Sequence, residues 1–296
     1  MKNTTLIAII AAAALIIAGV AIVLTNENNS NNDKDTIVVT MGWQKDMLDT
    51  ICDEQLNVVQ MLADGVSPHE EYSTPSNVIS LHSASIYFEI GSGVEWEEEF
   101  FSDVKADLPS SLTIVNCNDS IEYTALVNPE AEEGSSETDP HIWTSPEILK
   151  EIAAVALEQL ITSYPEYKDV FTTGYDSYIG EVDHAEDYIA NALSNIASGQ
   201  TVVVWHPAWQ YFLCQYLGMD MVGIEVGGEV EMEDVSSKMA GCSILYSSPF
   251  DEGAEFADAL SEGYGITVKL VNPTASNILS ELMKFADYLK NDLSSE

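Results

Sequence analysis

The sequence contains no arginine: its 10 basic residues are all lysine, set against 49 aspartate and glutamate residues. Because the arginine guanidinium is the usual bidentate partner of carboxylates and phosphates, its absence argues against a pocket for an anionic solute. The formal net charge of -39 would also repel nucleic acid and anionic membrane surfaces. A salt-adapted proteome would produce the same composition. Both explanations leave a cation as the easier ligand and exclude a nucleic-acid partner.

Cysteine is also scarce. The four cysteines, Cys52, Cys117, Cys214 and Cys242, form no CxxC pair and show none of the spacings of zinc fingers. An exported protein would permit a disulfide, and Cys214 with Cys242, in the same half of the chain, is the pair that we consider. Separate buried thiols are the alternative, and the sequence leaves both open.

A long apolar run stands near the N-terminus. Leu6–Leu24 comprises 19 apolar residues, follows Lys2 and precedes a polar stretch. This length spans a bilayer, and the lysine favours a cytoplasmic N-terminus. We therefore predict a membrane anchor over 1–25, a polar linker over 26–35 and an extracytoplasmic remainder, on the cell surface or in a periplasm-like space. A cleaved signal peptide, which would leave the protein secreted, is the alternative. No cysteine follows the run before Cys52, which excludes a lipid-modified cysteine at a mature N-terminus.

Strand-like and helix-like segments alternate through the rest of the chain, with helix patterns over 43–54, 95–107 and 147–163. Repeated strand-helix units predict parallel sheets. We therefore expect an α/β fold with two lobes, over 36–165 and 198–296, and a cleft between them. The predicted strands are 36–40, 58–62, 85–90 and 112–116 in the first lobe and 201–205, 221–224, 243–247 and 266–271 in the second.

A single long helix is predicted between the lobes, over 166–197. Apolar and aromatic residues recur there in steps of three and four, and Pro165 precedes the first turn. We expect a rigid connector that holds the two sheets at a nearly fixed separation. Gly174 and Gly180 should weaken this helix slightly. An ordinary core helix inside one domain is the alternative.

Three of the five histidines share a local setting. His206 lies in VVVWHPAWQYF, where a buried strand gives way to a loop, and open α/β sheets bind ligands at the carboxyl ends of their strands. His69 and His141 also have a proline beside them and an aromatic residue within three positions, so each lies on a short, stiff loop. We expect the three imidazoles to converge in the cleft and bind a metal ion. His82 and His184 lack these features and are expected to be solvated.

Four segments resemble, in order and spacing, the motifs of the solute-binding proteins of zinc and manganese ABC importers. They are GVSPHEEYSTPS, GVEW, DPHIWTSP and VVVWHPAWQYF, and DPHIW is the most specific. The resemblance extends over residues 36–292. It implies two (β/α) lobes joined by a rigid helix, an ion held between them and delivery to a membrane permease. It also implies that the family's three histidine ligands correspond to His69, His141 and His206.

The chain departs from this family at the fourth ligand. Relatives commonly have a carboxylate in a strand-end motif resembling LDP, whereas this chain reads VNP, so Asn272 offers a neutral amide. Three imidazoles without a carboxylate suit Zn2+ and suit Mn2+ less, because Mn2+ prefers oxygen donors. The fourth ligand is open between water, Asn272 and a carboxylate from Glu70, Glu225 or Asp251.

These patterns predict a monomeric binding protein that captures a divalent metal, with Zn2+ as first choice, and delivers it to an ABC transporter permease without catalysis. A surface adhesin or a metal-storage protein on the same fold is the first alternative. A zinc-dependent hydrolase is the second, because three imidazoles and a water on zinc also describe a hydrolytic site. The sequence has no HExxH motif, and Glu70 is the one obvious general base beside a predicted ligand. The missing motif and the lack of any other such base argue against the hydrolase.

Overall fold

The computed structural model describes residues 34–69, 74–119, 121–129, 137–225, 230, 232–239 and 241–294. Thr36–Glu296 forms one compact unit, separate from Met1–Asp35. The predicted anchor over 1–25 and most of the predicted linker over 26–35 lie outside the described residues. Within the described ranges, no helix combines the length and the apolar character needed to cross a membrane.

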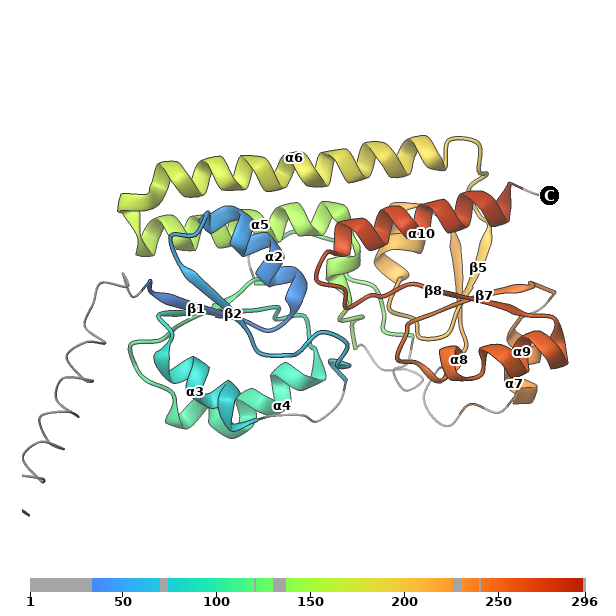
Figure 1. Cartoon of the computed structure of the whole chain (residues 1–296), viewed down its shortest axis with the longest axis horizontal. Coiled ribbons are helices and arrows are strands. Elements are labelled where there is room, and N and C mark those ends of the chain that lie inside the picture. The colour runs from blue at the N-terminus through green and yellow to red at the C-terminus, as the bar shows by residue number, and fades with distance from the viewer. Residues whose placement is uncertain are drawn as a thin grey trace, which may run out of the picture. The chain divides into compact units, whose positions relative to one another are not determined.

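Two four-stranded sheets form the centres of the two lobes (Figure 1). All strand pairs are parallel, with the order β2-β1-β3-β4 in the first sheet and β6-β5-β7-β8 in the second. The valine- and isoleucine-rich strands β1 and β5 lie centrally, and most of their side chains are buried. The strands are β1 (Thr36–Val39), β2 (Asn57–Gln60), β3 (Ile86–Glu89), β4 (Thr113–Asn116), β5 (Thr201–Val204), β6 (Asp220–Gly223), β7 (Ile244–Ser247) and β8 (Thr267–Leu270). The predicted α/β fold with two parallel sheets is confirmed.

Helices cover both faces of each sheet. In the first lobe, α2 (Gly42–Cys52) and α5 (Pro146–Ser163) lie on one side, and α3 (Pro75–Ser83) and α4 (Glu95–Val104) lie on the other. In the second lobe, α10 lies on one side and the three helices α7, α8 and α9 lie on the other. Their bounds are α7 (Met232–Met239), α8 (Glu252–Glu255), α9 (Ala257–Tyr264) and α10 (Ile278–Leu293).

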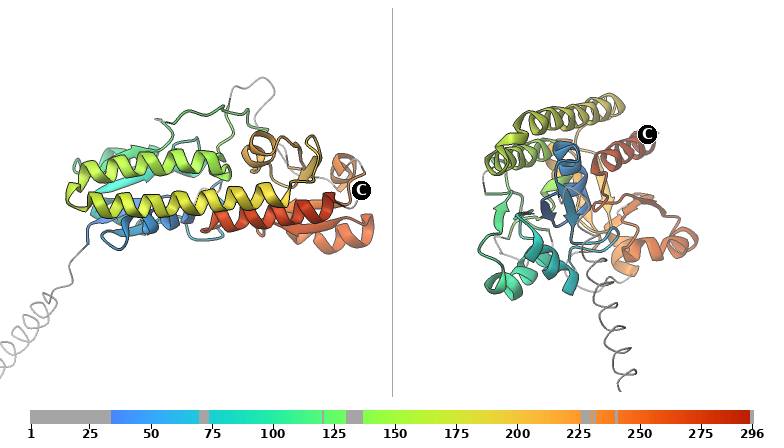
Figure 2. Two further views of the ribbon diagram at one scale, coloured as in Figure 1. Left: turned by 90° about the horizontal axis from the view of Figure 1, so that it is seen from above. Right: turned by 60° about the vertical axis from the view of Figure 1, so that its left-hand side comes forward.

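The long helix α6 (Lys168–Ala192) connects the lobes and packs against α2 and α5 of the first lobe and α10 of the second (Figures 1 and 2). It has 25 residues, fewer than the predicted range of 166–197, because Pro165–Tyr167 forms a separate 3-10 turn and the chain turns after Ala192 toward β5. Its buried face includes Phe171 and Val182. Gly174 has a packing role: a Cβ there would lie 2.5 Å from the backbone oxygens of Thr50 and Ile51.

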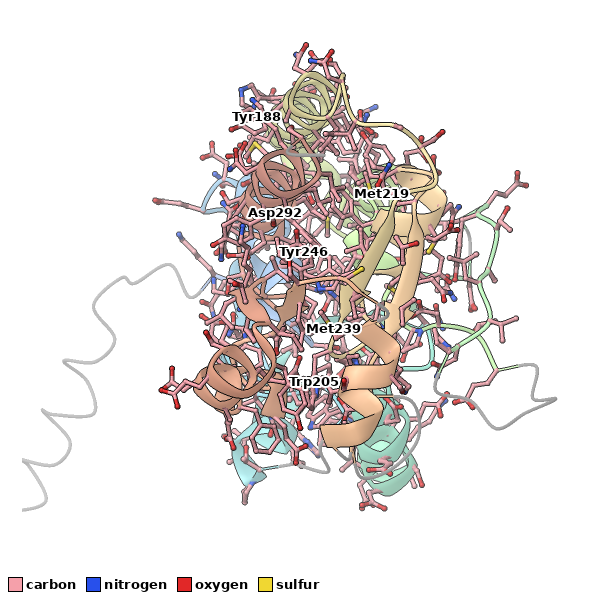
Figure 3. The ribbon with its side chains drawn as sticks, turned by 90° about the vertical axis from the view of Figure 1, so that its right-hand side faces the viewer. Tyr188, Trp205, Met219, Met239, Tyr246 and Asp292 are labelled. Carbon is pink, nitrogen blue, oxygen red and sulfur yellow. The ribbon has the colours of Figure 1, made fainter. Side chains whose placement is uncertain are left out.

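Polar contacts join β7 and β8 of the second sheet to α10. Tyr246 of β7 donates a hydrogen bond to the Asp292 carboxylate of α10 at 2.6 Å (Figure 3). Lys269 of β8 pairs with the same carboxylate. On the surface, the Tyr188 hydroxyl of α6 donates to Asp287 of α10. These contacts attach the second sheet, through α10, to the connecting helix.

All four cysteines are free thiols, so of the two alternatives left open by the sequence the structure has separate thiols and no Cys214–Cys242 disulfide. The two side chains pack against different hydrophobic clusters. Cys214 contacts the main core, which extends through both lobes, whereas Cys242 contacts a smaller cluster that includes Val203 and Val235. A disulfide would require the two sulfur atoms to lie about 2 Å apart, which side chains in separate clusters do not allow.

Candidate metal site

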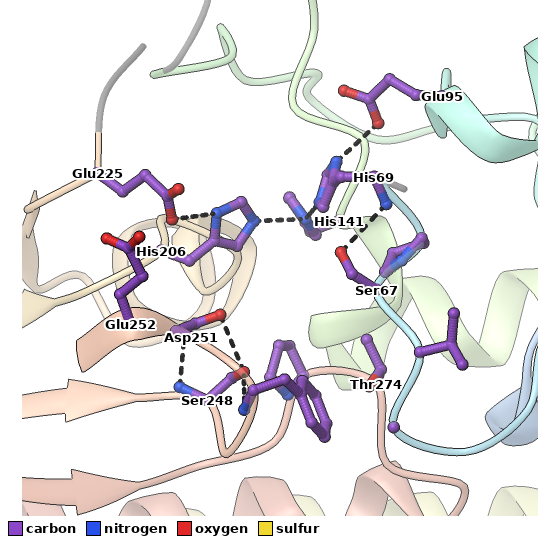
Figure 4. A pocket seen from close by; sticks show the side chains of 15 residues that line it. Ser67, His69, Glu95, His141, His206, Glu225, Ser248, Asp251, Glu252 and Thr274 are labelled. Carbon is purple, nitrogen blue, oxygen red and sulfur yellow. Dashed lines mark hydrogen bonds and ion pairs between the residues drawn. The ribbon is translucent and has the colours of Figure 1, made fainter. Parts of the chain in front are cut away.

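The structure brings His69, His141 and His206 together in the cleft between the lobes (Figure 4). His206 lies two residues after β5, His69 lies in the connection between β2 and α3, and His141 precedes α5. The Nε2 atom of His141 lies 3.0 Å from that of His69 and 3.3 Å from that of His206. The candidate ligand atoms of all three lie within 4.8 Å of one another. Three ring nitrogens at this spacing are close enough to share one ion.

Each histidine has a carboxylate at its other ring nitrogen. Glu95 lies 2.7 Å from Nδ1 of His69, and Asp139 lies 2.8 Å from Nδ1 of His141. Glu225 lies 3.6 Å from Nδ1 of His206. A carboxylate on the outer nitrogen fixes the tautomer in which Nε2 carries a lone pair, and metal-binding histidines commonly have such a partner.

Local backbone bonds hold these carboxylates beside their histidines. The N–H of Trp96 donates to the carbonyl of Pro68, which joins the start of α4 to the loop that carries His69. The N–H of Glu225 donates to the carbonyl of Trp205, the residue before His206. In the third pair the Asp139 carboxylate also accepts the backbone N–H of His141, at 2.9 Å. The histidines and their partners are therefore positioned by the same loops.

The central histidine is the most buried of the three. His141 is 3% exposed. Burial lowers its pKa, and the neighbouring His206 and His69 also lower it, whereas Asp139 raises it. The net lowering keeps the imidazole neutral at neutral pH, as a metal ligand must be. The pKa of Glu95 is also lowered: burial alone would raise it, but the hydrogen bond and the charge of His69 prevail.

A cavity of about 460 Å³ opens onto the three histidines. Residues of both lobes line it, including four carboxylates, from Glu95, Glu225, Asp251 and Glu252 (Figure 4). No lysine is among the described lining residues. A cavity lined by acidic side chains, with no lysine among its described lining residues, favours a cation and disfavours an anion. The electrostatics of the cleft thus agree with the composition of the chain.

The candidates for a fourth ligand have other partners in this conformation. Asn272 is not among the described residues that line the cavity, and its Oδ1 accepts the N–H and the hydroxyl of Thr274. Asp251 accepts the N–H and the hydroxyl of Ser248. Glu225 lies at the outer nitrogen of His206. Glu70 lies outside the described residues.

Sequence reasoning missed two residues of this arrangement, Glu95 and Asp139. Both lie inside recognised motifs, GVEW and DPHIWTSP, so their place in the motifs was the available signal. His82 and His184 are exposed, as expected for solvated side chains. The ring nitrogen Nδ1 of His82 lies 2.9 Å from the carbonyl of Val78 in its own helix.

Two parallel α/β lobes, one connecting helix and a histidine cluster in the cleft define a two-lobed binding protein. The model of the family described as "Zinc-uptake complex component A periplasmic" (ZnuA) matches residues 37–240, more than half of the chain. The chain belongs to this family, as its motifs indicated.

Known relatives and structures agree with this assignment. The chain is 27% identical over 277 residues to the "High-affinity zinc uptake system protein ZnuA" of Yersinia pestis, covering 81% of this chain and 83% of the relative. It is 25% identical over 190 residues to the "Manganese-binding lipoprotein MntA" of Halalkalibacterium halodurans, covering 64% of this chain and 59% of that protein. A crystal structure of ZnuA shares the fold, with a TM-score of 0.77 and 21% identity over 88% of this chain and 100% of its own.

Proposed function

We propose that this protein is an extracytoplasmic solute-binding protein that captures a divalent transition metal, with Zn2+ as the first choice, and delivers it to an ABC importer permease. One observation supports this most directly. Three Nε2 atoms, from His69, His141 and His206, face one another, and each ring has a carboxylate at its outer nitrogen. This is the donor set of a histidine-bound metal ion with its supporting hydrogen bonds. The ion is cargo, so the protein performs no chemistry on it.

The donor set supports zinc over manganese. Zn2+ accepts three imidazoles and a water in a tetrahedron, whereas Mn2+ favours oxygen ligands. Glu95 and Asp139 lie at the outer nitrogens of their histidines, and the Asn272 and Asp251 oxygens accept other hydrogen bonds. We therefore assign the fourth position to water. A manganese-binding relative exists, so the metal must be tested directly.

The decisive experiment titrates stripped protein with Zn2+ and with Mn2+ in buffer of high salt concentration. We expect one equivalent of Zn2+ to bind and to outcompete Mn2+. Alanine at His69, His141 or His206 should weaken zinc binding by at least about a hundredfold, since each removes one of three protein ligands. The exposed His82 and His184 supply matched alanine controls, which should bind as the wild type does. Zinc binding that survives all three ligand substitutions would disprove this site.

Transport requires a separate test in cells. Deleting the gene should reduce zinc uptake by metal-starved cells, and a copy with His141→Ala should not restore it. Uptake that is unchanged by deletion would leave a zinc-binding protein with another role, such as storage. Fractionation of cells that express the chain would show whether 1–25 anchors the protein outside the cytoplasm, as we infer from the apolar run. A measurement of its mass in solution would test whether it is a monomer, as we propose.

A further inference from the structure

The turn after β8 occupies the place where the resemblance leads one to expect a carboxylate ligand. Here Asn272 closes the turn: its Oδ1 accepts the N–H of Thr274 at 2.9 Å and the Thr274 hydroxyl at 3.0 Å. The N–H of Asn272 donates to the Glu281 carboxylate, in the first turn of α10, at 3.1 Å. The amide oxygen therefore helps to shape the turn. This oxygen points at Thr274 and not at the histidines.

The same turn forms contacts between the lobes. The indole N–H of Trp143, in the first lobe, donates to the carbonyl of Pro273 at 2.7 Å, and Trp143 is fully buried. The Ser276 hydroxyl donates to the Asp64 carboxylate at 2.8 Å. Gly42 permits this close approach, because a Cβ there would collide with the Ser276 hydroxyl. The turn thus contacts the first lobe at two points.

One of these points lies directly behind the histidine cluster. Trp143 follows His141 by two positions, and the centroids of the two rings lie 5.3 Å apart in an edge-on arrangement. On its other face Trp143 stacks on Trp43, 6.0 Å away. The Nε2 atom of His141 lies 3.0 Å from that of His69 and 3.3 Å from that of His206. A shift of the Pro273 carbonyl would therefore be transmitted through Trp143 to the centre of the cluster.

We propose that Asn272 is a positioning residue and not a metal ligand. It shapes the turn that presents the Pro273 carbonyl to Trp143, and this bond between the lobes sets the rate at which the ion leaves. The fourth coordination position stays with water. This inference rests on the proposed metal-binding function and assigns a role to the residue at which the chain departs from its relatives.

Two substitutions at Asn272 separate a positioning role from a ligating role. In Asn272→Asp a side-chain oxygen can still accept both donors of Thr274, whereas in Asn272→Ala it cannot. With Co2+ as a spectroscopic probe, we expect both variants to keep the visible absorption spectrum and the stoichiometry of the wild type. Release of the ion should be about fivefold faster in Asn272→Ala, the factor that corresponds to one hydrogen bond, and unchanged in Asn272→Asp.

Trp143→Phe removes the indole N–H that donates to the Pro273 carbonyl. It should accelerate release of the ion to the same degree as Asn272→Ala. Because both act through one hydrogen bond, the double variant should release no faster than the single variants. The proposal is overturned if Asn272→Asp changes the Co2+ spectrum or tightens binding a hundredfold. It is also overturned if Asn272→Ala alters the spectrum, or if the effects of Asn272→Ala and Trp143→Phe simply add.

Amide hydrogen exchange of the metal-free protein tests the contact without any ion. Asn272→Ala should accelerate exchange both in 271–276 and in 139–144, and Asn272→Asp should do neither. His69→Ala serves as a control that removes a ligand and should leave exchange in 271–276 unchanged. If the wild type bound no metal, the proposed function would fail. Hydrogen exchange would still show whether the turn 271–276 is coupled to 139–144. Acceleration confined to 271–276 would refute the coupling even in a protein that binds zinc.

Discussion

The three carboxylates behind the histidines should contribute unequally to zinc affinity, and the structure predicts their order. Asp139 is the strongest candidate: its carboxylate is 0% exposed and lies 2.8 Å from His141. Glu95 lies at a similar distance, 2.7 Å, from His69, but is 45% exposed. Glu225 is 40% exposed and lies 3.6 Å from His206, beyond a good hydrogen bond. The variants Asp139→Asn, Glu95→Gln and Glu225→Gln neutralise one carboxylate each. Their zinc affinities show how burial and distance determine the contribution of each carboxylate.

The expected magnitudes follow from these environments. Loss of a buried carboxylate behind a metal-binding histidine typically weakens affinity by about 10- to 100-fold, which we expect for Asp139→Asn. Solvent screening limits exposed pairs to about fivefold, the ceiling that we expect for Glu95→Gln. Glu225→Gln should change affinity by about twofold or less, since its pair is both exposed and long.

Competition against a chromogenic zinc chelator at neutral pH and high salt would measure all three affinities. Asp139 Oδ2 has no hydrogen-bond partner among the described residues, so an amide there would leave a buried N–H unpartnered. Circular dichroism must therefore show that Asp139→Asn is folded at the assay temperature. The reasoning is refuted if Glu225→Gln weakens binding as much as folded Asp139→Asn does.

Three further predictions concern pH and packing. Zinc affinity should fall below about pH 6.5, the ordinary histidine pKa, because the ligands must be neutral, and affinity unchanged at pH 5 would contradict histidine ligation. Burial raises the pKa of Glu97 from 4.5 to about 7, so its contribution to stability is complete below 4.5 and is lost as the pH rises through 7. Urea unfolding should show this loss, about 3 kcal/mol, in the wild type and not in Glu97→Gln. Gly174→Ala should destabilise the protein by about 2 kcal/mol or more, through its clash with the backbone of α2, whereas Gly180→Ala, with no atom within 4 Å, should stabilise it by up to about 1 kcal/mol. Equal melting temperatures for these two variants would contradict the packing of α6.

The strands and the positions of the histidines were predictable because they depend on local patterns. A run such as Val202–Val204 must be buried on both faces, and a proline after His206 stops the strand, so the histidine falls at the carboxyl end of a central strand. Eight such runs sufficed to predict two parallel sheets. The ends of the connecting helix were less predictable, because apolar spacing continues through Leu193 and Ile196 although the helix ends at Ala192.

Two contacts at the site depend on tertiary packing that no local pattern reveals. Glu95 and His69 are 26 positions apart, and Trp143 and Pro273 are 130 positions apart. Their contacts exist only once α4 has packed beside the His69 loop and the lobes have docked. The choice between a disulfide and separate thiols stayed open for the same reason, since only the folded structure shows that Cys214 and Cys242 contact different clusters.

In the cleft, different groups attract cations and select among them: the carboxylates attract cations, and the histidine nitrogens select. Its four carboxylates attract any cation, and a chain with a net charge of -39 does so over its whole surface. Sodium, magnesium and calcium prefer oxygen ligands, but Glu95 and Asp139 are held at the outer nitrogens of their histidines and Asp251 is bonded to Ser248. The Nε2 atoms of His69 and His206 both lie close to that of His141. We therefore expect the cleft to attract all cations and the histidine cluster to prefer an ion that accepts nitrogen ligands.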